Sequence, residues 1–289
     1  MKVGFVILSY KNVDDTVECI RSLRKLSDGN EHRIYLIDNS ETPEYAEGIL
    51  RQVTVERFAS VPNRGYAHGN NVGMRMAYED GCDLIVVMNN DTVAEPDFLG
   101  PMAEFLQKTP GVGLISPLIL TFQGHRIWSS GGYYRRLLGN YAMTREPIRV
   151  PTEAEFVSGC CCCFRRELLD SVGYFEESYF MYNEDSDWCY RIAKAGLKNY
   201  ILPKSVLYHK VSLSTGVNSP FQLYYIYRNR LTFVYRNLKG PKKAYYLLAN
   251  RMVTRMHFFR YLFRRDRARA DALRYALKDA KHITGRYRY

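Results

Sequence analysis

The sequence lacks long apolar runs. No stretch reaches the roughly 18 consecutive apolar residues that a membrane-spanning helix needs, although 46% of the 289 residues are hydrophobic and can bury a full core. The apolar run at the amino terminus, Val3 to Leu8, is too short for the apolar region of a signal peptide, and no small-residue cleavage site follows it. We therefore expect neither a secretory nor a membrane-spanning segment, and we expect a cytoplasmic location.

The cysteines lack the pattern of a disulfide framework. Their number is seven, and four are consecutive, Cys160 to Cys163, so that neighbouring side chains point to opposite faces of a strand and cannot all pair. This predicts a reducing compartment and small apolar residues in a buried strand. The Cys160-x-x-Cys163 spacing leaves a zinc or redox site as an alternative, but the sequence has no second pair of this kind.

Acidic residues are scarce in the last quarter of the chain. Residues 216–289 hold 18 Lys and Arg but 3 Asp and Glu, a net charge of +15, whereas residues 1–215 have a net charge of −4. This division predicts an α/β domain over residues 1–215 and a basic, aromatic-rich helical region over 216–289. A nucleic-acid-binding protein is an alternative for the basic region. It does not explain the acidic first part, so we expect no nucleic-acid partner.

The first part alternates between short apolar, β-rich runs and helical patterns, which is typical of a mostly parallel sheet covered by helices. Residues 120–157 are weakly patterned and predict an irregular or antiparallel insertion that faces a substrate. A buried strand, a short helix and a longer helix are expected after it, and from Pro220 the pattern is helical to the end, with a break at Gly240-Pro241. The predicted strands of the first part are Val3–Leu8, Arg33–Ile37, Val53–Phe58, Leu84–Met88 and Gly113–Ile115.

Polar residues follow several of these strands, at the positions where ligands bind in open α/β sheets. Asp91 comes directly after an apolar strand, where one carboxylate together with phosphate oxygens and water suits Mg²⁺ or Mn²⁺; a cap for the next helix is the alternative. Asp38 ends the second strand and could accept a hydrogen bond from a nucleobase or ribose, or simply form a turn. The segment from Asn63 through Arg64 and Gly65 opens a helix where backbone N–H groups and a cation could meet phosphate.

Three carboxylates lie within four residues at a predicted helix start, in Glu184-Asp185-Ser186-Asp187. Helix capping and the helix dipole explain one or two of them. The mutual repulsion of a third makes a general base or a metal site the alternative. His209 follows a strand-like segment and is either a partly buried imidazole or a metal ligand.

In this order, these motifs resemble family 2 glycosyltransferases of the GT-A fold, and in particular the bacterial rhamnosyltransferase-like branch that builds cell-surface polysaccharides. The resemblance implies a Rossmann-like α/β fold with helices on both faces of the sheet, plus a C-terminal helical appendage. It extends over the first 215 positions. The residues that carry it are Val6-Ile-Leu-Ser-Tyr10, Ile37-Asp-Asn-Ser40, Asn63-Arg-Gly-Tyr-Ala-His-Gly-Asn-Asn71, Met88-Asn-Asn-Asp-Thr92, Ser158-Gly159, Gly173-Tyr-Phe-Glu-Glu177, Tyr182-Asn-Glu-Asp-Ser-Asp187, Arg191 and Tyr208-His209.

The resemblance also implies roles for single residues. Asp185 matches the catalytic base, which deprotonates the acceptor hydroxyl, and the family inverts configuration. Asp91 matches the last acid of a DxD-type motif that reads Asn89-Asn90-Asp91 here, so Asp91 with His209 would hold Mg²⁺ or Mn²⁺. The residues expected on the donor side are Ser9, Tyr10, Asp38, Asn63, Arg64, Gly65, Asn89 and Asn90. Those expected on the acceptor side are Ser158, Gly159, Glu184 and Asp187.

The expected reaction is transfer of a sugar from a nucleotide-diphosphate donor, dTDP-L-rhamnose or a UDP-sugar, to a saccharide or polyprenyl-linked acceptor in cell-surface polysaccharide synthesis. A sugar nucleotidyltransferase shares the fold class. It would need a glycine-rich, lysine-bearing loop after the first strand, and Ser9-Tyr10-Lys11-Asn12 does not supply one. The oligomeric state stays open.

A helix from Tyr245 would align six large apolar side chains on one face, with cations on the flanks and back. Such a stripe predicts either an interfacial helix on an anionic membrane, with a peripheral position on its inner face through residues 241–289, or packing of the stripe onto the catalytic domain. The segment Tyr224–Asn229 is expected to line the acceptor or to dock the appendage. The stripe consists of Tyr245, Leu248, Met252, Met256, Phe259 and Phe263.

Overall fold

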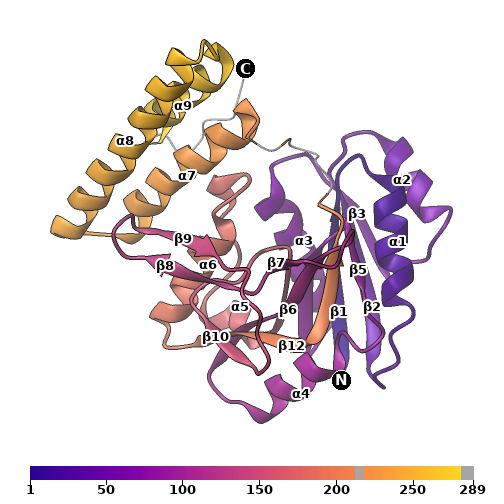
Figure 1. Ribbon diagram of the computed structural model, residues 1–289. Helices are drawn as coiled ribbons and strands as arrows, with labels where there is room; N and C mark the ends of the chain where they lie inside the picture. Colours follow the sequence, from indigo (N-terminus) through magenta and orange to yellow (C-terminus); the bar gives the residue numbers. More distant parts are fainter. Residues whose placement is uncertain (212–215, 217, 281–289) are drawn as a thin grey trace.

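The computed structural model describes residues 1–211, 216 and 218–280, and its elements alternate between strand and helix over most of the chain (Figure 1). The strands are β1 (Lys2–Ser9), β2 (Glu31–Asp38), β3 (Arg57–Ser60), β4 (Leu84–Asn89), β5 (Thr92–Ala94), β6 (Val112–Thr121), β7 (Ile127–Ser129), β8 (Gly132–Arg135), β9 (Asn140–Met143), β10 (Thr152–Ala154), β11 (Cys161–Arg165) and β12 (Lys198–His209). The helices are α1 (Val13–Leu23), α2 (Pro43–Leu50), α3 (Tyr66–Glu79), α4 (Gly100–Lys108), α5 (Glu167–Ser171), the 3-10 helix η1 (Glu177–Tyr179), α6 (Glu184–Lys194), α7 (Pro220–Asn237), α8 (Gly240–Phe263) and α9 (Arg267–Asp279).

The central sheet has ten strands and is mostly parallel. Its order is β10-β12-β6-β11-β4-β1-β2-β3, with β5 on β12 and β7 on β6. β4, β1, β2 and β3 run parallel, β12 runs parallel to β6, and β11 lies antiparallel between β4 and β6. The predicted α/β fold is therefore confirmed. The arrangement also brings the carboxyl ends of β1, β2 and β4 to one edge.

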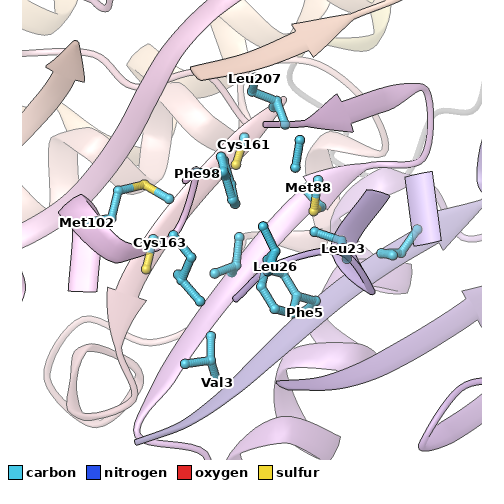
Figure 2. Packing of buried hydrophobic residues seen from close by; sticks show 14 of the residues in the cluster. Val3, Phe5, Leu23, Leu26, Met88, Phe98, Met102, Cys161, Cys163 and Leu207 are labelled. Atoms are coloured by element: carbon cyan, nitrogen blue, oxygen red, sulfur yellow. The ribbon is translucent and has the colours of Figure 1, made fainter. Parts of the chain in front are cut away.

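Helices cover both faces of this sheet because its strands are apolar on both sides. In β1, Phe5 and Ile7 enter the core that includes α1 and α4, whereas Val6 and Leu8 enter the core that includes α3 and α6. Successive side chains of a strand point to opposite faces, so a strand covered on both sides needs an uninterrupted apolar run. Figure 2 shows the first core, where side chains of α1, β1, β4 and β11 gather.

The cysteines are part of these cores. All seven are buried and free; Cys161 and Cys163 point into the first core and Cys162 into the second (Figure 2). The prediction of small apolar residues in a buried strand is thus confirmed. Within the ranges that the structure describes, no three His, Cys, Asp or Glu side chains gather closely enough to hold a metal, so the zinc alternative finds no support.

Two predicted strands have different bounds. The third strand begins at Arg57 instead of Val53. Val53 and Val55 lie in the connection after α2, where they pack against the first core but do not pair with β2. Their alternating burial therefore produced the sequence pattern of a strand. The fifth predicted strand, Gly113–Ile115, corresponds to β6, which is longer and extends from Val112 to Thr121. The insertion at 120–157 is antiparallel, as expected: β8 and β9 form a separate two-stranded sheet.

The last described part of the chain forms three helices, α7, α8 and α9, gathered at one end of the molecule with α8 on the outside (Figure 1). α7 ends at Asn237 and α8 begins at Gly240, so the predicted break lies where expected. The stretch 281–289, which belongs to the predicted basic region, lies outside the described residues. None of the described helices combines the length and the apolar character that crossing a membrane requires.

The apolar stripe of α8 does not pack onto the rest of the protein. Phe263 is 85% exposed, Met256 68% and Tyr245 51%, whereas Asn250 and Thr254 are buried at 5% and 1% exposure. The packing alternative is therefore wrong. The face that contacts the protein holds polar residues whose hydrogen bonds are satisfied locally: the Asn250 amide donates to the Leu138 carbonyl, and the Thr254 hydroxyl donates to the Asn250 carbonyl.

Candidate active site at the carboxyl edge of the sheet

The predicted donor residues meet because three strands end together. Ser9 is paired with Asp38 across β1 and β2, and Leu8 is paired with Asn89 across β1 and β4. The Asn39 backbone N–H donates to the Ser9 carbonyl at 3.1 Å, which continues the ladder beyond the strand ends. The first, second and fourth strands therefore present their terminal polar residues side by side, at the edge where this class of sheet binds ligands.

Asp38 is a fully buried carboxylate at this edge. It accepts hydrogen bonds from the Ser40 hydroxyl at 2.6 Å and the Ser40 backbone N–H at 3.3 Å. Burial raises the pKa of Asp38, although the two bonds from Ser40 lower it in part. Ser9, its partner across the ladder, is buried, with its hydroxyl 3.2 Å from the Thr16 hydroxyl, and Tyr10, the next residue, is 44% exposed. A buried acceptor and an exposed ring at the ends of neighbouring strands suit a nucleobase or ribose.

The segment 63–65 is tied to the same edge. The Asn63 side-chain oxygen accepts from the Asn39 amide at 3.3 Å and from the Gly65 backbone N–H at 3.1 Å. Gly65 has a φ of +100°, and a Cβ there would lie 2.2 Å from the Phe180 carbonyl oxygen, so this position needs glycine. The Arg64 side chain is exposed. The predicted donor residues of this segment therefore adjoin those of the second strand.

Asp91 and His209 form a pair across β5 and β12. His209 is paired in register with Thr92, which follows Asp91 in the chain, and His209 Nε2 lies 3.2 Å from Asp91 Oδ1. Both side chains are buried. Burial lowers the pKa of His209, but Cys160 and the Asp91 carboxylate raise it above its usual value overall. The structure thus brings together the two predicted metal ligands.

These two groups fit a divalent cation. His209 Nε2 and Asp91 Oδ1 lie 3.2 Å apart, a separation at which both atoms could bind the same ion. Mg²⁺ and Mn²⁺ at nucleotide sites take one or two protein ligands and complete their coordination with phosphate and water. A carboxylate paired with an imidazole is such a partial set.

Asp185 lies in the first turn of α6, where backbone N–H groups support its charged form. Its carboxylate accepts hydrogen bonds from the Gly159 backbone N–H at 3.1 Å and the Ser186 backbone N–H at 2.7 Å. Burial raises the pKa of Asp185, and these bonds hold the rise in check. Glu184, at 5% exposure, has no such support: its Oε2 is buried without a hydrogen bond among the described residues, and burial followed by the Asp185 charge raises its pKa strongly. Asp185 therefore has two backbone donors that favour its charged form, whereas the buried Glu184 Oε2 has none among the described residues.

A short segment before β11 connects the two acidic centres. Gly159 donates to Asp185, and the carbonyl of the next residue, Cys160, accepts from the Asn89 backbone N–H at 2.9 Å. Asn89 lies two residues before Asp91. Asp185 and the Asp91–His209 pair therefore both border residues 158–160, as a shared substrate pocket requires, and the predicted acceptor residues Ser158 and Gly159 lie between them.

Asp187 lies in a different environment from its two neighbours. It is buried and bonded to Arg191 at 2.8 Å, to the Tyr179 hydroxyl at 3.1 Å and to the Asn237 amide at 2.6 Å. A carboxylate with this many internal donors joins α6 to η1 and α7. Its geometry supports the pocket wall and gives no support to the predicted contact with the acceptor.

The sequence pattern did not identify the residues that hold the loop before α6. Phe180, Tyr182 and Asn183 all have positive φ values, between 63° and 75°, a backbone state that costs energy outside glycine. Two buried side chains of α7 compensate. Arg228 donates to the Ser178 and Tyr179 carbonyls, and Asn229 donates to the Tyr179, Met181 and Tyr182 carbonyls at 2.6 to 2.9 Å. The segment Tyr224–Asn229 thus docks the appendage, one of its two predicted roles.

Thr16 is a second residue that the pattern missed. The Thr16 hydroxyl accepts a hydrogen bond from the Asn90 amide at 2.8 Å and lies 3.2 Å from the Ser9 hydroxyl. Thr16, on α1, therefore holds two of the residues predicted to bind the sugar donor. A threonine in an amphipathic helix carries no local signal of such a role.

Comparison with known proteins agrees with this geometry. Residues 5–173, more than half of the chain, match the family described as Glycosyl transferase family 2. The low-salt glycan biosynthesis hexosyltransferase Agl10 of Haloferax volcanii is 24% identical over 233 residues, which cover 79% of this chain and 74% of that protein. The N-acetylglucosaminyl-diphospho-decaprenol L-rhamnosyltransferase of Mycobacterium tuberculosis is 28% identical over 211 residues, which cover 63% of this chain and 68% of that protein.

Among solved structures, the fold is similar to that of the mannosyltransferase PcManGT from Pyrobaculum calidifontis, solved in complex with GDP-Man and Mn²⁺. The TM-score is 0.58 at 17% identity, and the match covers 97% of this chain and 73% of the other. At this identity the likeness shows the GT-A fold alone. The family match over residues 5–173 shows that the chain belongs to glycosyl transferase family 2.

Proposed function

We propose that this glycosyltransferase moves a sugar, with inversion, from a nucleoside-diphosphate donor to a hydroxyl group of a saccharide or polyprenyl-linked acceptor. The observation that carries the proposal is the position of Asp185. It accepts from the Gly159 N–H, on the segment whose next residue, Cys160, accepts from Asn89. A base at Asp185 would therefore lie near the proposed donor-binding edge. The motif order of the rhamnosyltransferase-like branch supports the same reaction.

The donor nucleotide would lie along the ends of β1, β2 and β4. Asp38 supplies a buried acceptor for a base or ribose hydrogen, and Tyr10 supplies an exposed ring beside it. The exposed Arg64 guanidinium stands at the opening of α3, where the diphosphate charge is favoured. A dTDP-sugar is the first donor to test, because a relative from Shigella flexneri, 20% identical over 188 residues, is named dTDP-rhamnosyl transferase RfbF; UDP-sugars come second.

Asp91 and His209 would hold Mg²⁺ or Mn²⁺ against the diphosphate. Such an ion, when bound, neutralises the charge that develops on the leaving diphosphate. The two groups that would bind the ion are buried, with His209 Nε2 3.2 Å from Asp91 Oδ1. The pairing of β5 with β12, in which Thr92 is opposite His209, holds Asp91 in this position. Asn89 replaces the first acid of a DxD-type motif and Asn90 occupies its variable middle position, so Asp91 is the single carboxylate there.

Asp185 would accept the proton of the acceptor hydroxyl as its oxygen attacks the anomeric carbon. The new carbon–oxygen bond forms on the face opposite the diphosphate, the bond to the phosphate oxygen breaks, and its electron pair leaves with the nucleoside diphosphate. A carboxylate is able to do this when it is charged yet poorly solvated, which describes Asp185. The raised pKa of Glu184 favours its neutral form, which would add no second negative charge beside Asp185.

The acceptor side is proposed to take a lipid-linked saccharide. The name of the Mycobacterium tuberculosis relative includes a diphospho-decaprenol acceptor, and that of the Haloferax volcanii relative refers to glycan biosynthesis. The antiparallel insertion β8–β9 borders α8 through the bond from Tyr246 to the Arg136 carbonyl at 2.6 Å. A long acceptor would therefore extend from the pocket toward the C-terminal helices.

The experiment is a turnover assay that follows nucleoside-diphosphate release from dTDP-L-rhamnose and from UDP-sugars, with Mn²⁺, with Mg²⁺ and with EDTA. We expect one donor class to support turnover and EDTA to abolish it. Asp91→Ala should weaken donor binding in the presence of Mn²⁺, as measured by calorimetry. Absence of turnover with every donor and with both saccharide and polyprenyl-linked acceptors would contradict the proposal, as would full activity in EDTA.

A further inference from the structure

The helix α8 has its polarity reversed relative to an ordinary surface helix. The side chains that face the protein include Asn250 and Thr254, both buried, while the stripe on the opposite side is exposed. A surface helix of a soluble protein normally buries its apolar stripe and exposes its polar face. An outward apolar stripe of this length, with an inward face that is satisfied by hydrogen bonds, indicates an apolar environment outside the protein.

The stripe is long and continuous. At 1.5 Å per residue, its span from Tyr245 to Phe263 is about 27 Å. Leu137, in the β8–β9 turn, is 77% exposed and extends the patch, because the Tyr245 hydroxyl donates to the Leu137 carbonyl at 3.2 Å. The exposed fractions along the stripe are 51% for Tyr245, 59% for Leu248, 54% for Met252, 68% for Met256, 50% for Phe259 and 85% for Phe263.

Cations border this stripe and have no acidic partners. Lys242, Arg255 and Arg260 are exposed on the flanks of α8, and none takes part in the ion pairs found among the described residues. The acids of the basic region are already engaged: Asp266 pairs with Arg269, Asp271 pairs with Arg274, and Asp279 accepts a hydrogen bond from Tyr224. The positive charge is therefore available to an external anionic surface.

We propose that α8 docks this protein onto the anionic surface of a lipid bilayer, lying in the interface with its stripe inserted and its flanking cations against the lipid headgroups. An apolar face between rows of Lys and Arg is the pattern that binds such a surface. A second copy of the chain fits less well, because two α8 faces in contact would oppose two rows of cations. The inference goes beyond the sugar chemistry and does not depend on it.

The first test is flotation of the full chain with vesicles, without donor or acceptor. We expect binding to vesicles of phosphatidylcholine with phosphatidylglycerol, weaker binding to phosphatidylcholine alone, and partial loss in high salt. The double variant Met256→Glu with Phe259→Glu should reduce binding at least about tenfold. Leu50→Glu with Val150→Glu, at two exposed apolar positions away from α8, makes the same charge change and should keep at least half of the binding.

A second measurement places the stripe in the lipid directly. Because all seven native cysteines are buried, Phe263→Cys can be labelled selectively with an environment-sensitive dye, with Val150→Cys as the control. A blue shift on adding anionic vesicles at position 263 and none at 150 supports the proposal. It is overturned if the α8 double variant binds vesicles as the wild type does, or if the wild type binds none. Dimers in sedimentation velocity that dissociate in the α8 variant, without vesicle binding, would also overturn it and assign the stripe to self-association.

Discussion

The carboxyl edge of the sheet and the outer face of α8 depart from ordinary burial in opposite ways. At the sheet edge, the carboxyl groups of Asp38 and Asp91 are buried, where an isolated charge is costly. On α8, large apolar side chains lie in solvent at half exposure or more. Each departure destabilises the isolated protein, and binding of an external partner would offset that cost.

The two regions differ in how that partner is recognised. The sheet edge uses few polar groups at fixed positions, each oriented by backbone bonds, as a small polar ligand requires. The α8 face uses area and diffuse charge without fixed geometry, as a fluid surface requires. A site that needs precision is built on strand ends, and a docking surface is built on a helix at the periphery. Disrupting either region should therefore leave the function of the other intact.

The largest expected effect is at the base. Asp185→Asn keeps the shape of the side chain but removes proton acceptance, so kcat should fall by a factor of about 10³, with the donor Kd within about threefold of wild type. Glu184→Gln is the matched control: the pKa of Glu184 is raised by burial, and the proposed mechanism gives its carboxylate no proton to accept. This variant should therefore keep at least a third of the wild-type kcat, a change of about 0.6 kcal/mol. Turnover and calorimetry on both variants measure this. A Glu184→Gln variant as inactive as Asp185→Asn would show that the assignment of the two roles is wrong.

The next effect sharpens the difference between α7 and α8. Asn229 and Asn250 are both buried asparagines on the C-terminal helices, but Asn229 holds the loop that leads to Asp185, whereas Asn250 bonds to Leu138 and Tyr246. Each change to alanine leaves unpaired carbonyls and should lower the free energy of unfolding by about 1–3 kcal/mol.

Only Asn229→Ala should also lower kcat, by about tenfold, since a misplaced base costs reactivity. Denaturant unfolding and turnover at a temperature where both variants are folded separate these effects. Equal kcat losses in the two variants would mean that helix stability alone explains them, and that the loop contacts do not position the base.

The pH dependence tests the pocket itself. Because burial raises the pKa of Asp185, its loss of charge on acidification begins at higher pH than for an exposed aspartate. The charged form is the base, so kcat should fall as pH decreases through this raised pKa. Glu184 and Tyr66, which act on Asp185 through their charges, both have raised pKa values, mainly because of burial. A rate that is flat down to the ordinary pKa of aspartate would contradict the buried base.

These regions also differ in what the sequence alone could predict. The sheet edge was predictable because its signal is local: an apolar run followed by a polar residue locates Asp38 and Asp91, and the parallel topology brings them together. The hydrogen bonds that hold the loop before Asp185 were not predictable. Their donors, Arg228 and Asn229, lie more than forty positions away in the chain. Their acceptors are backbone carbonyls, which any residue type supplies, so the sequence does not mark them.

The orientation of α8 was open for a different reason. Periodicity reveals that Tyr245 to Phe263 share a face, but it does not reveal which face contacts the protein. The opposite face can be buried only if Asn250 has hydrogen-bond partners there, and one of them is the Leu138 carbonyl in a distant turn. Hydrogen bonds between distant segments therefore set the orientation of α8. Bonds of the same kind hold the loop before Asp185.

The smallest effect concerns stability. Burial and the Asp185 charge raise the pKa of Glu184 in the folded protein, so folding favours its protonated form. The stabilising contribution of that proton is present below the unfolded pKa and is lost as pH rises toward the folded pKa. Glu184→Gln removes this dependence and should stabilise the protein at pH 8 by about 1 kcal/mol relative to wild type, with little difference at pH 4. The exposed Glu104, whose pKa is lowered by Lys108, should give no gain when changed to Gln. Thermal unfolding of the three proteins at both pH values measures this, and a Glu184→Gln variant less stable than wild type at pH 8 would mean that the buried carboxylate is charged and paired in the fold.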